Sequence, residues 1–387
     1  MKNPMRSIVW CLVALAAIGW SGEAAGCTSI TVGKEASTDG SVMTSHTCDS
    51  HRTASSIEVV LPAQYAAGVE ITLTKRTDDD SGPMERYGRE VTGSIPQVEK
   101  THGYLNPAYA SMNEHQVAIS ESTFGGREEL VSQVGIIDCE TLTRLMLERA
   151  STARQAITVA GDLLENHGWV DEGEALVVTD PDEAWMFEVV GPGPDEVGAV
   201  WVAQRIPDDH VAVMANCSRI GEIDLDDPDQ FMASENVKSF AAEQGYWDPD
   251  SGEPFRYWQA YDPDGNYSFS CSRRVWRVFD LLAPSLELNA NQGVFPVSVK
   301  PEEQVSPEKI MELLRDTYEG TDYDPVKDLT VTDEDGKTVK SPLANPFMPY
   351  DMNKLLKTNG GWGWRGERPI ARWYAMYVTV TQSRSWL

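Results

Sequence analysis

The sequence has few positive charges and few histidines. Its 387 residues carry 32 Lys+Arg against 60 Asp+Glu, a formal net charge of −28, and only 6 histidines. A surface this acidic repels phosphate backbones, so we expect no nucleic-acid partner. The hydrophobic fraction of 41% is enough for a large core. This composition excludes a disordered or fibrous chain.

The sequence also lacks the usual motifs of several enzyme classes. It contains no Gly-x-Ser-x-Gly, no His-Glu-x-x-His and no Cys-x-x-Cys. Serine-hydrolase, zinc-peptidase and zinc-ribbon interpretations therefore have no support. No stretch reaches the roughly 18 unbroken apolar residues of a membrane helix, so we expect no transmembrane span.

The first 26 residues have the pattern of an export signal. Lys2 and Arg6 form a basic start, and the apolar run 8–19 is too short to span a bilayer. The small residues Ala24-Ala25-Gly26 suit signal peptidase. We expect cleavage after Gly26 and an exported protein, periplasmic or extracellular, whose domain runs over residues 27–387.

Cleavage at that point would make Cys27 the first residue of the mature chain. The residues after Cys27 alternate small polar and apolar side chains, as a half-buried strand does. A free α-amine has a pKa near 8. It could take the thiol proton and later return it to a leaving amine, so one residue would combine nucleophile and base.

Two other roles compete for Cys27. The segment Ala-Ala-Gly-Cys resembles a lipobox, which would acylate the cysteine, but Ala24 stands where leucine is usual and Glu23 interrupts the apolar run. A disulfide is the second alternative. Removing Cys11 with the signal leaves five cysteines, an odd number. If Cys27 is the unpaired one, the other four can form two bridges.

The hydrophobic pattern predicts sheets packed against helices in layers. Strands are expected within 27–62 and at 117–121, 175–179, 184–190, 200–206 and 211–215, and helices over 142–164 (one or a pair), 272–283 and 307–318. Residues 63–110 are predicted to be irregular, and 285–365 to be loops around the last helix. Strands, then helices, then strands argue against a doubly wound parallel fold.

Several short blocks, spread from residue 27 to the end, are similar to one family. The blocks are Cys27–Lys34 with Asp39–Met43, Met112–Glu114 with Val117–Ser122, Trp201–Asp209 with Ala215-Asn216, Arg274–Trp276, Tyr323–Pro325, Arg368–Ile370 and Thr381–Arg384. In order and spacing they resemble the cysteine dipeptidases of dipeptidase A type, which are N-terminal-nucleophile (Ntn) hydrolases.

The resemblance implies an α+β fold, an αββα sandwich of two antiparallel sheets between helix layers. It implies hydrolysis of small peptides, namely dipeptides, without a metal or other cofactor. The family's C-terminal segment normally continues beyond Leu387, so we expect a short or truncated member. The sequence leaves monomer and homo-oligomer both open.

The resemblance also suggests site residues. Asp49 falls where an aspartate could hold the α-amine, Asn216 matches the oxyanion asparagine, and Arg274 matches an arginine beside the nucleophile, with Arg273 leaving the register open by one. A backbone N–H near Ser122 or Thr123 would be the second oxyanion donor, and we include Thr123 among the substrate-binding residues. His46 stands where the family has arginine. It is either a functional replacement that titrates near neutrality or a partly buried polar residue.

Two further functions remain open at this point. An N-acyl amide hydrolase, like the bile-salt hydrolases and penicillin V acylases, would use the same chemistry with an apolar pocket, whereas a dipeptidase needs an acidic anchor for the substrate amine. A non-catalytic, lipid-anchored surface protein would keep the fold with an acylated Cys27.

Overall fold

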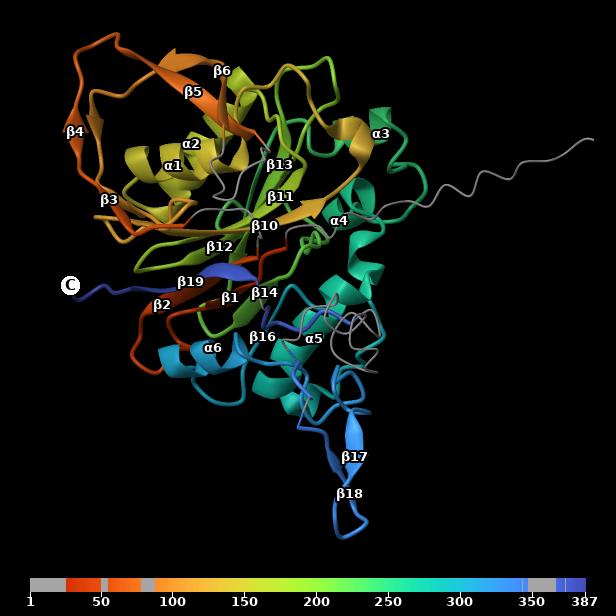
Figure 1. The fold of residues 1–387 in the computed structure, drawn as a ribbon. Helices are drawn as coiled ribbons and strands as arrows, with labels where there is room; N and C mark the ends of the chain where they lie inside the picture. The colour runs from red at the N-terminus through yellow and green to blue at the C-terminus, as the bar shows by residue number, and fades with distance from the viewer. Residues whose placement is uncertain (1–25, 50–54, 78–87, 343, 347–366, 373) are drawn as a thin grey trace, which may run out of the picture.

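The computed structural model describes residues 26–49, 55–77, 88–342, 344–346, 367–372 and 374–387 (Figure 1). Two antiparallel sheets dominate it. The five-stranded sheet has the order β16 (Ser298–Val299), β14 (Val211–Met214), β1 (Ser29–Val32), β2 (Val42–Asp49), β19 (Ala375–Ser383). The eight-stranded sheet has the order β15 (Phe231–Ala233), β13 (Val200–Ile206), β12 (Ala184–Val190), β11 (Gly173–Thr179), β10 (Ala118–Gly125), β9 (Met112–Asn113), β8 (Tyr104–Asn106), β3 (Glu58–Val60).

The two sheets share an apolar core. Along β14, Ala212 and Met214 belong to the same buried cluster as Ala175 and Val177 of β11. The intervening residues of both strands belong to other clusters. Since successive side chains of a strand point to opposite faces, this alternation shows that the sheets face each other and that each has a second buried face.

Helices cover those second faces. On the eight-stranded sheet lie α1 (Cys139–Arg149) and α2 (Ala153–His167), which share a cluster with β11 and β12. On the five-stranded sheet lie α5 (Phe269–Leu282) and α6 (Pro307–Leu313). The order of layers is therefore helix, sheet, sheet, helix, the sandwich architecture that was expected. Two short helices, α3 (Ser239–Glu243) and α4 (Tyr257–Tyr261), pack beside the shared core.

The sequence pattern located the buried elements well. The strands expected between 175 and 215 are β11 to β14, and the segment 142–164 is the pair α1 and α2. Asp138 and Thr152 cap these two helices by accepting hydrogen bonds from Thr141 N and Gln155 N.

One expectation about the fold was wrong. Residues 63–110, predicted to be irregular, include the hairpin β5 (Glu70–Thr77) and β6 (Gly88–Pro96) and the pair β4 (Ala63–Gln64) and β7 (Lys100–Thr101). Among the described residues of β5 and β6 only Leu73 and Ile95 are buried, and the rest are half-buried or exposed, so their sequence carries little apolar alternation to detect. A further hairpin, β17 (Thr330–Thr332) with β18 (Thr338–Lys340), projects from the body in a region expected to be loop (Figure 1).

The expectations about the export signal, membrane spans and disulfide bridges each have a separate outcome. The export signal lies outside the described residues. Within the described part of the chain, no helix is long and apolar enough to cross a membrane. The five cysteines described are all free, so the two bridges that the cysteine count allowed are not formed. Cys271, for example, donates its thiol hydrogen to Asn216 O at 2.9 Å.

Candidate active site

Cys27 lies just before β1, at the start of the described chain. Its backbone is held by the neighbouring strand, because Thr28 N donates to Thr47 Oγ1 of β2 at 2.9 Å. On the other side, Ser122 Oγ of β10 donates to Cys27 O at 3.3 Å. The Cys27 side chain is buried, with 6% of its surface exposed. The two sheets together therefore fix the position of the sulfur.

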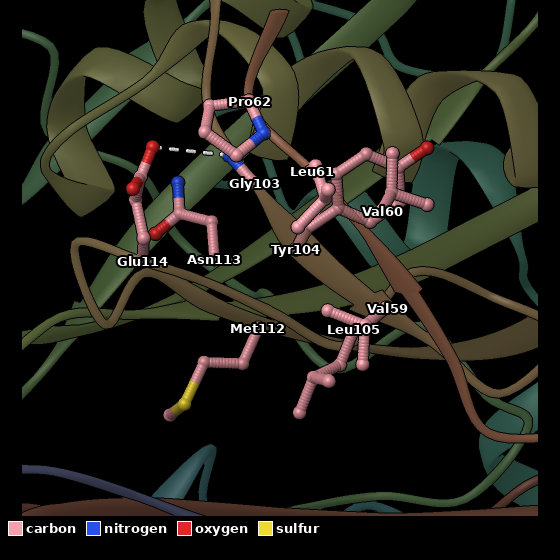
Figure 2. A pocket seen from close by; sticks show the side chains of 10 residues that line it. All are labelled: Val59, Val60, Leu61, Pro62, Gly103, Tyr104, Leu105, Met112, Asn113 and Glu114. Atoms are coloured by element: carbon pink, nitrogen blue, oxygen red, sulfur yellow. Dashed lines mark hydrogen bonds between the residues drawn. The ribbon is translucent and has the colours of Figure 1, made fainter.

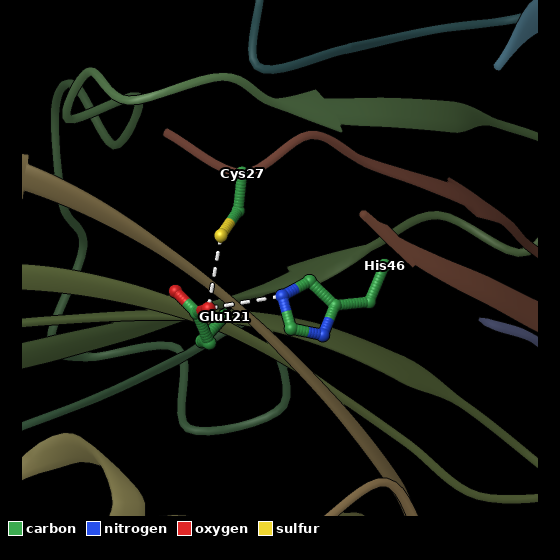
Figure 3. Close-up of side chains that lie close together, drawn as sticks. All are labelled: Cys27, His46 and Glu121. Carbon is green, nitrogen blue, oxygen red and sulfur yellow. Dashed lines mark hydrogen bonds and ion pairs between the residues drawn. The ribbon is translucent and has the colours of Figure 1, made fainter. Parts of the chain in front are cut away.

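The Cys27 sulfur lies beside the carboxylate of Glu121 and the imidazole of His46 (Figure 3). Cys27 Sγ donates to Glu121 Oε1 at 2.9 Å, and His46 Nε2 lies 2.9 Å from the same oxygen. His46 comes from β2 and Glu121 from β10, so each sheet contributes one of them. The other ring nitrogen, His46 Nδ1, lies 3.2 Å from the Tyr377 hydroxyl of β19.

Burial and mutual charge set the protonation of this cluster. Burial of the His46 ring opposes its charged form, but the Glu121 carboxylate and the hydrogen bonds with Cys27 and Glu121 outweigh it and raise the His46 pKa to about 10. For Glu121, burial favours the neutral acid, yet the facing imidazolium holds its pKa below the usual value. Contact with Cys48, burial and the charge of Glu121 together raise the pKa of the Cys27 thiol.

These shifts correct one expectation. His46 was considered as a group that titrates near neutrality, but with a pKa of about 10 it stays protonated there. As for the alternative of a partly buried polar residue, His46 is buried, at 2% exposed, and it contacts the carboxylate beside the sulfur. A fixed cation on β2 therefore occupies the position at which the family resemblance suggested an arginine.

Asp49, at the end of β2, lies against the residue that precedes Cys27. Arg368 Nη2 donates to Asp49 Oδ2 at 2.5 Å and also to the carbonyl oxygen of Gly26. The second carboxylate oxygen, Asp49 Oδ1, is buried and has no hydrogen-bond partner within the described chain. Burial raises the pKa of Asp49, opposed by the charge of Arg368. A buried acceptor thus remains open beside the Gly26–Cys27 bond.

Asn216 follows β14 with its backbone in the left-handed region, at φ 60°. Three contacts hold it there. Its backbone N donates to Ser122 Oγ at 2.9 Å, Nδ2 donates to Thr123 O at 2.6 Å, and Oδ1 accepts from Arg274 Nη2 at 2.8 Å. An amide nitrogen carries two hydrogens. The Thr123 bond uses one of them, which leaves the second as a donor for a ligand.

Arg274 of α5 donates hydrogen bonds to several groups around Cys27. Nη1 donates to Cys27 O and to Thr28 Oγ1, both at 2.8 Å, and Nη2 donates to Ala215 O as well as to Asn216. The side chain is buried, with 1% exposed. Arg273, by contrast, pairs with Glu367 at 2.7 Å and stacks on Tyr323. The sequence could not decide which of the two arginines lies beside the nucleophile position, and the structure places Arg274 there.

Thr123 reaches the site through its carbonyl group, which accepts from Asn216. Its hydroxyl donates to Glu174 Oε2 at 2.9 Å. Glu174 is buried, and burial together with the charge of Glu121 raises its pKa well above the usual value. The contacts of Thr123 thus link Asn216 to a second buried carboxyl group.

All six predicted residues therefore lie within one network of contacts around Cys27. Two members were missed, namely Glu121 and Arg368. Glu121 had a signal, since it is a carboxylate in a strand of otherwise small or apolar residues. Arg368 was quoted only within a matching block, and its pairing with a residue 319 positions away leaves no trace in local sequence.

Several side chains could hold a metal ion. The donor atoms of Cys27, His46 and Glu121 lie within 4.8 Å of one another, as do those of Glu121, Cys139 and Glu174. A third group, His102, Glu114 and His115, lies apart from both. Near that third group is an apolar pocket of about 310 Å³ at the edge of the eight-stranded sheet, between β3, β8 and β9 (Figure 2). None of its lining residues belongs to the Cys27 cluster.

A buried cysteine between two antiparallel sheets, with a carboxylate, an imidazolium and a preset amide around it, is the arrangement of a cysteine-dependent hydrolase. The comparison with protein families agrees, because the model of peptidase family C69 matches residues 26–345. The chain belongs to peptidase family C69, a family of cysteine peptidases.

Curated relatives carry related names. The chain is 28% identical over 311 residues to a "Probable dipeptidase" of Salmonella dublin, covering 79% of this chain and 69% of the relative. It is 28% identical over 315 residues to a "Probable dipeptidase" of Latilactobacillus sakei, covering 79% and 63%. To "Dipeptidase A" of Lactobacillus helveticus it is 25% identical over 344 residues, covering 86% and 68%. The chain thus spans about two thirds of the length of these relatives.

Proposed function

We propose that this protein is an exported dipeptidase whose nucleophile is the thiol of an N-terminal Cys27, released by cleavage after Gly26. The observation that carries this proposal is the contact of 2.9 Å between Cys27 Sγ and the Glu121 carboxylate. Family membership and the names of the relatives support the same activity.

The surroundings of the sulfur favour a peptide with a free amine over an acyl amide. An acyl chain requires an apolar pocket, because it makes no polar contacts. The side chains that contact Cys27 or lie one contact away are instead charged or polar, among them Glu121, His46 and Glu174. The ionised Glu121 carboxylate beside the sulfur offers an acceptor for the ammonium group of a dipeptide.

The position of Gly26 supports activation by cleavage. Its carbonyl oxygen contacts Arg368, and a Cβ on this residue would lie 2.7 Å from both Asn216 Oδ1 and Arg368 Nη2. Gly26 therefore fills the space between the oxyanion asparagine and the Asp49–Arg368 pair. Its removal would open that space to substrate. An N–H of the new α-amino group would then find the buried acceptor Asp49 Oδ1, which lacks a partner among the described residues.

The first half of the reaction forms a thioester. The α-amine of Cys27 takes the thiol proton, and the sulfur attacks the carbonyl carbon of the dipeptide. The free N–H of Asn216 and a backbone amide near Thr123 stabilise the oxyanion, a contribution of about 2.7–4 kcal/mol for one donor. The α-ammonium then gives its proton to the leaving amino acid as the C–N bond breaks.

The second half restores the enzyme. The α-amine takes a proton from water, the resulting hydroxide attacks the thioester, and the first amino acid leaves as the sulfur regains a proton. In both halves Glu121 keeps the sulfur in place, and His46 keeps Glu121 ionised, so neither needs to change its charge. The assignment to the Ntn hydrolases and their N-terminal-nucleophile mechanism belongs to this proposal.

Two measurements test it. N-terminal sequencing and intact mass of the exported protein should give a chain that starts at an unmodified Cys27. Another start, or the added mass of a diacylglyceryl group, contradicts the nucleophile. A panel of dipeptides and N-acyl amides is then compared between wild type and Cys27→Ser, with the thermal midpoint as a folding control. Loss of dipeptide turnover supports the proposal. Unchanged turnover refutes it, and turnover of the N-acyl amides alone identifies an amidase instead.

A further inference from the structure

Two histidines and a glutamate form a compact group outside the Cys27 site. His102 comes from the link between β7 and β8, and Glu114 and His115 come from the turn between β9 and β10. His115 Nε2 lies 3.0 Å from His102 Nδ1, and Glu114 Oε1 lies 3.6 Å from the same nitrogen. The three donor atoms all lie within 4.8 Å of one another.

These distances match the edges of a metal coordination tetrahedron. Zinc binds imidazole nitrogen at about 2.0–2.1 Å and carboxylate oxygen at about 2.0–2.2 Å, so neighbouring ligand atoms lie about 3.3–3.4 Å apart. The observed separations of 3.0 and 3.6 Å lie on either side of that value. One ion can therefore contact all three donors after small side-chain movements, and a water would complete the tetrahedron.

Hydrogen bonds already orient two of the three donors. His102 Nε2 lies 3.3 Å from Ser151 Oγ, and with its hydrogen on Nε2 the ring presents the lone pair of Nδ1 to the cluster. The Glu114 carboxylate accepts from Gly103 N at 3.1 Å, the contact drawn in Figure 2. Polar partners behind the ligands are typical of metal sites, since they fix the tautomer and the orientation.

The turn that carries Glu114 and His115 is itself anchored. Asn113 Oδ1 accepts from His115 N and Val117 N, both at 3.0 Å. Its Nδ2 donates to Leu147 O and Ala150 O at the end of α1. Because the turn is tied to a buried helix end, the ligands are held in position before any ion arrives.

The charges around the group suit a divalent cation. Two imidazole nitrogens and one carboxylate oxygen form a donor set that Zn²⁺ takes in proteins. Lys100 is the nearby opposing charge, within a chain whose formal net charge is −28.

We propose that His102, Glu114 and His115 bind a divalent transition-metal ion of the Zn²⁺ type, separate from the Cys27 site. The ion joins the link between β7 and β8 to the turn that leads into β10. Since β10 carries Glu121, Ser122 and Thr123, the metal stabilises the strand that supports the active site. It takes no part in the peptidase reaction proposed above.

Metal titration of the mature chain tests this. Calorimetry with Zn²⁺ and absorption spectra with Co²⁺ are recorded on Cys27→Ser protein, which removes the sulfur of one of the two other candidate groups. The comparison with His115→Ala separates the remaining group, Glu121, Cys139 and Glu174, from the proposed site. We expect one saturable equivalent, tetrahedral Co²⁺ bands and a higher thermal midpoint with Zn²⁺. His115→Ala should weaken binding at least tenfold. The exposed position of His115 keeps folding intact, and its thermal midpoint without metal should match that of the parent.

His210→Ala is the matched control, because His210 is a partly exposed histidine that contacts Ser298 and lies outside the cluster. This variant should keep the full equivalent. The proposal is overturned if the parent shows no saturable binding. It is also overturned if His115→Ala binds Zn²⁺ as the parent does, or if His210→Ala loses the site equally.

Discussion

The Cys27 thiol donates a hydrogen bond of 2.9 Å to the Glu121 carboxylate, across the interface of the two sheets. The donor lies just before β1 of the five-stranded sheet, and the acceptor lies on β10 of the eight-stranded sheet. The position of the sulfur is therefore set by how the sheets pack, not by a local turn. Changes to residues in this interface should act on the nucleophile through Glu121.

Replacing Glu121 by glutamine tests this relationship. Glutamine keeps the shape but removes the charge that opposes the burial of the His46 cation, so the His46 pKa should fall from about 10. We expect kcat to drop by about 10²-fold, because the thiol loses its charged acceptor. An NMR pH titration of the His46 ring measures the shift. The exposed Glu172→Gln is the control, and an unchanged His46 titration in Glu121→Gln would contradict the interpretation.

The charge of His46 should also contribute to stability in a defined pH window. Its folded-state pKa of about 10 lies above the ordinary value of 6.5, so the folded chain binds the proton more tightly than the unfolded chain does. The stabilising effect is then complete below pH 6.5 and is lost as the pH rises through about 10. His46→Gln should lower the thermal midpoint most at pH 6 and least near pH 10. A difference independent of pH would show that the ring is neutral.

The buried layers could be predicted from the sequence because a buried strand or helix repeats its apolar residues at the spacing of that element. Strand β11 alternates between two apolar clusters, and α2 repeats its buried positions at helical spacing. The hairpin of β5 and β6 buries only Leu73 and Ile95 among its described residues, so this constraint is weak there and the hairpin was missed. Its strands pair through the backbone, which any sequence can supply.

Local sequence predicted some of the site residues but not the contacts between residues that are distant in the chain. Cys27 and Asn216 stand in blocks that resemble a family, and Asp49 was suggested only by the position that the resemblance implies. The structure brings all three together. The contacts of Glu121 and Arg368 join residues 94 and 319 positions apart, so they arise from the packing of the layers. The raised pKa of His46 likewise depends on burial opposite Glu121, which no property of the His46 segment indicates.

Asn216 offers a way to separate catalysis from backbone strain. Its φ of 60° is tolerated by glycine and asparagine but costs other residues about 1–2 kcal/mol. Asn216→Gly should keep the fold and lose the amide donor, so kcat should fall by about 10²–10³-fold with little change in KM. Asn216→Ala should show the same loss of kcat and a lower thermal midpoint as well. Full activity in Asn216→Gly would exclude the oxyanion role.

Asp49 and Arg368 should behave as a coupled pair. Removing one partner leaves a buried charge uncompensated, so Arg368→Met should lower the free energy of unfolding by about 3–5 kcal/mol. Asp49→Asn in the same chain removes the orphaned carboxylate and should restore part of that loss. Urea unfolding of both single variants and of the double variant gives the coupling energy. If the two effects simply add, the 2.5 Å contact contributes no interaction energy.

Arg274 should act on catalysis through the groups that it positions. Its planar fork contacts Cys27 O, Ala215 O and Asn216 Oδ1 at once, and a lysine has a single charged nitrogen that cannot reproduce this geometry. Arg274→Lys keeps the charge but removes the bond to Asn216 Oδ1, so that the Asn216 side chain is held only by its bond to Thr123 O. Because one oxyanion donor is worth about 10²–10³-fold, partial loss of its alignment should lower kcat by about tenfold or more.

The neighbouring Arg273→Lys provides the matched control. Arg273 is buried, pairs with Glu367 and stacks on Tyr323, and it makes none of the contacts to Cys27 O, Ala215 O and Asn216 Oδ1. Its replacement by lysine should therefore leave kcat within about twofold and act on stability instead. Steady-state kinetics of both variants measure the difference. A raised KM with normal kcat in Arg274→Lys would instead assign this arginine to substrate binding. Equal losses of kcat in the two variants would show that α5 acts as a whole, because the helix would then have shifted against β14 in both.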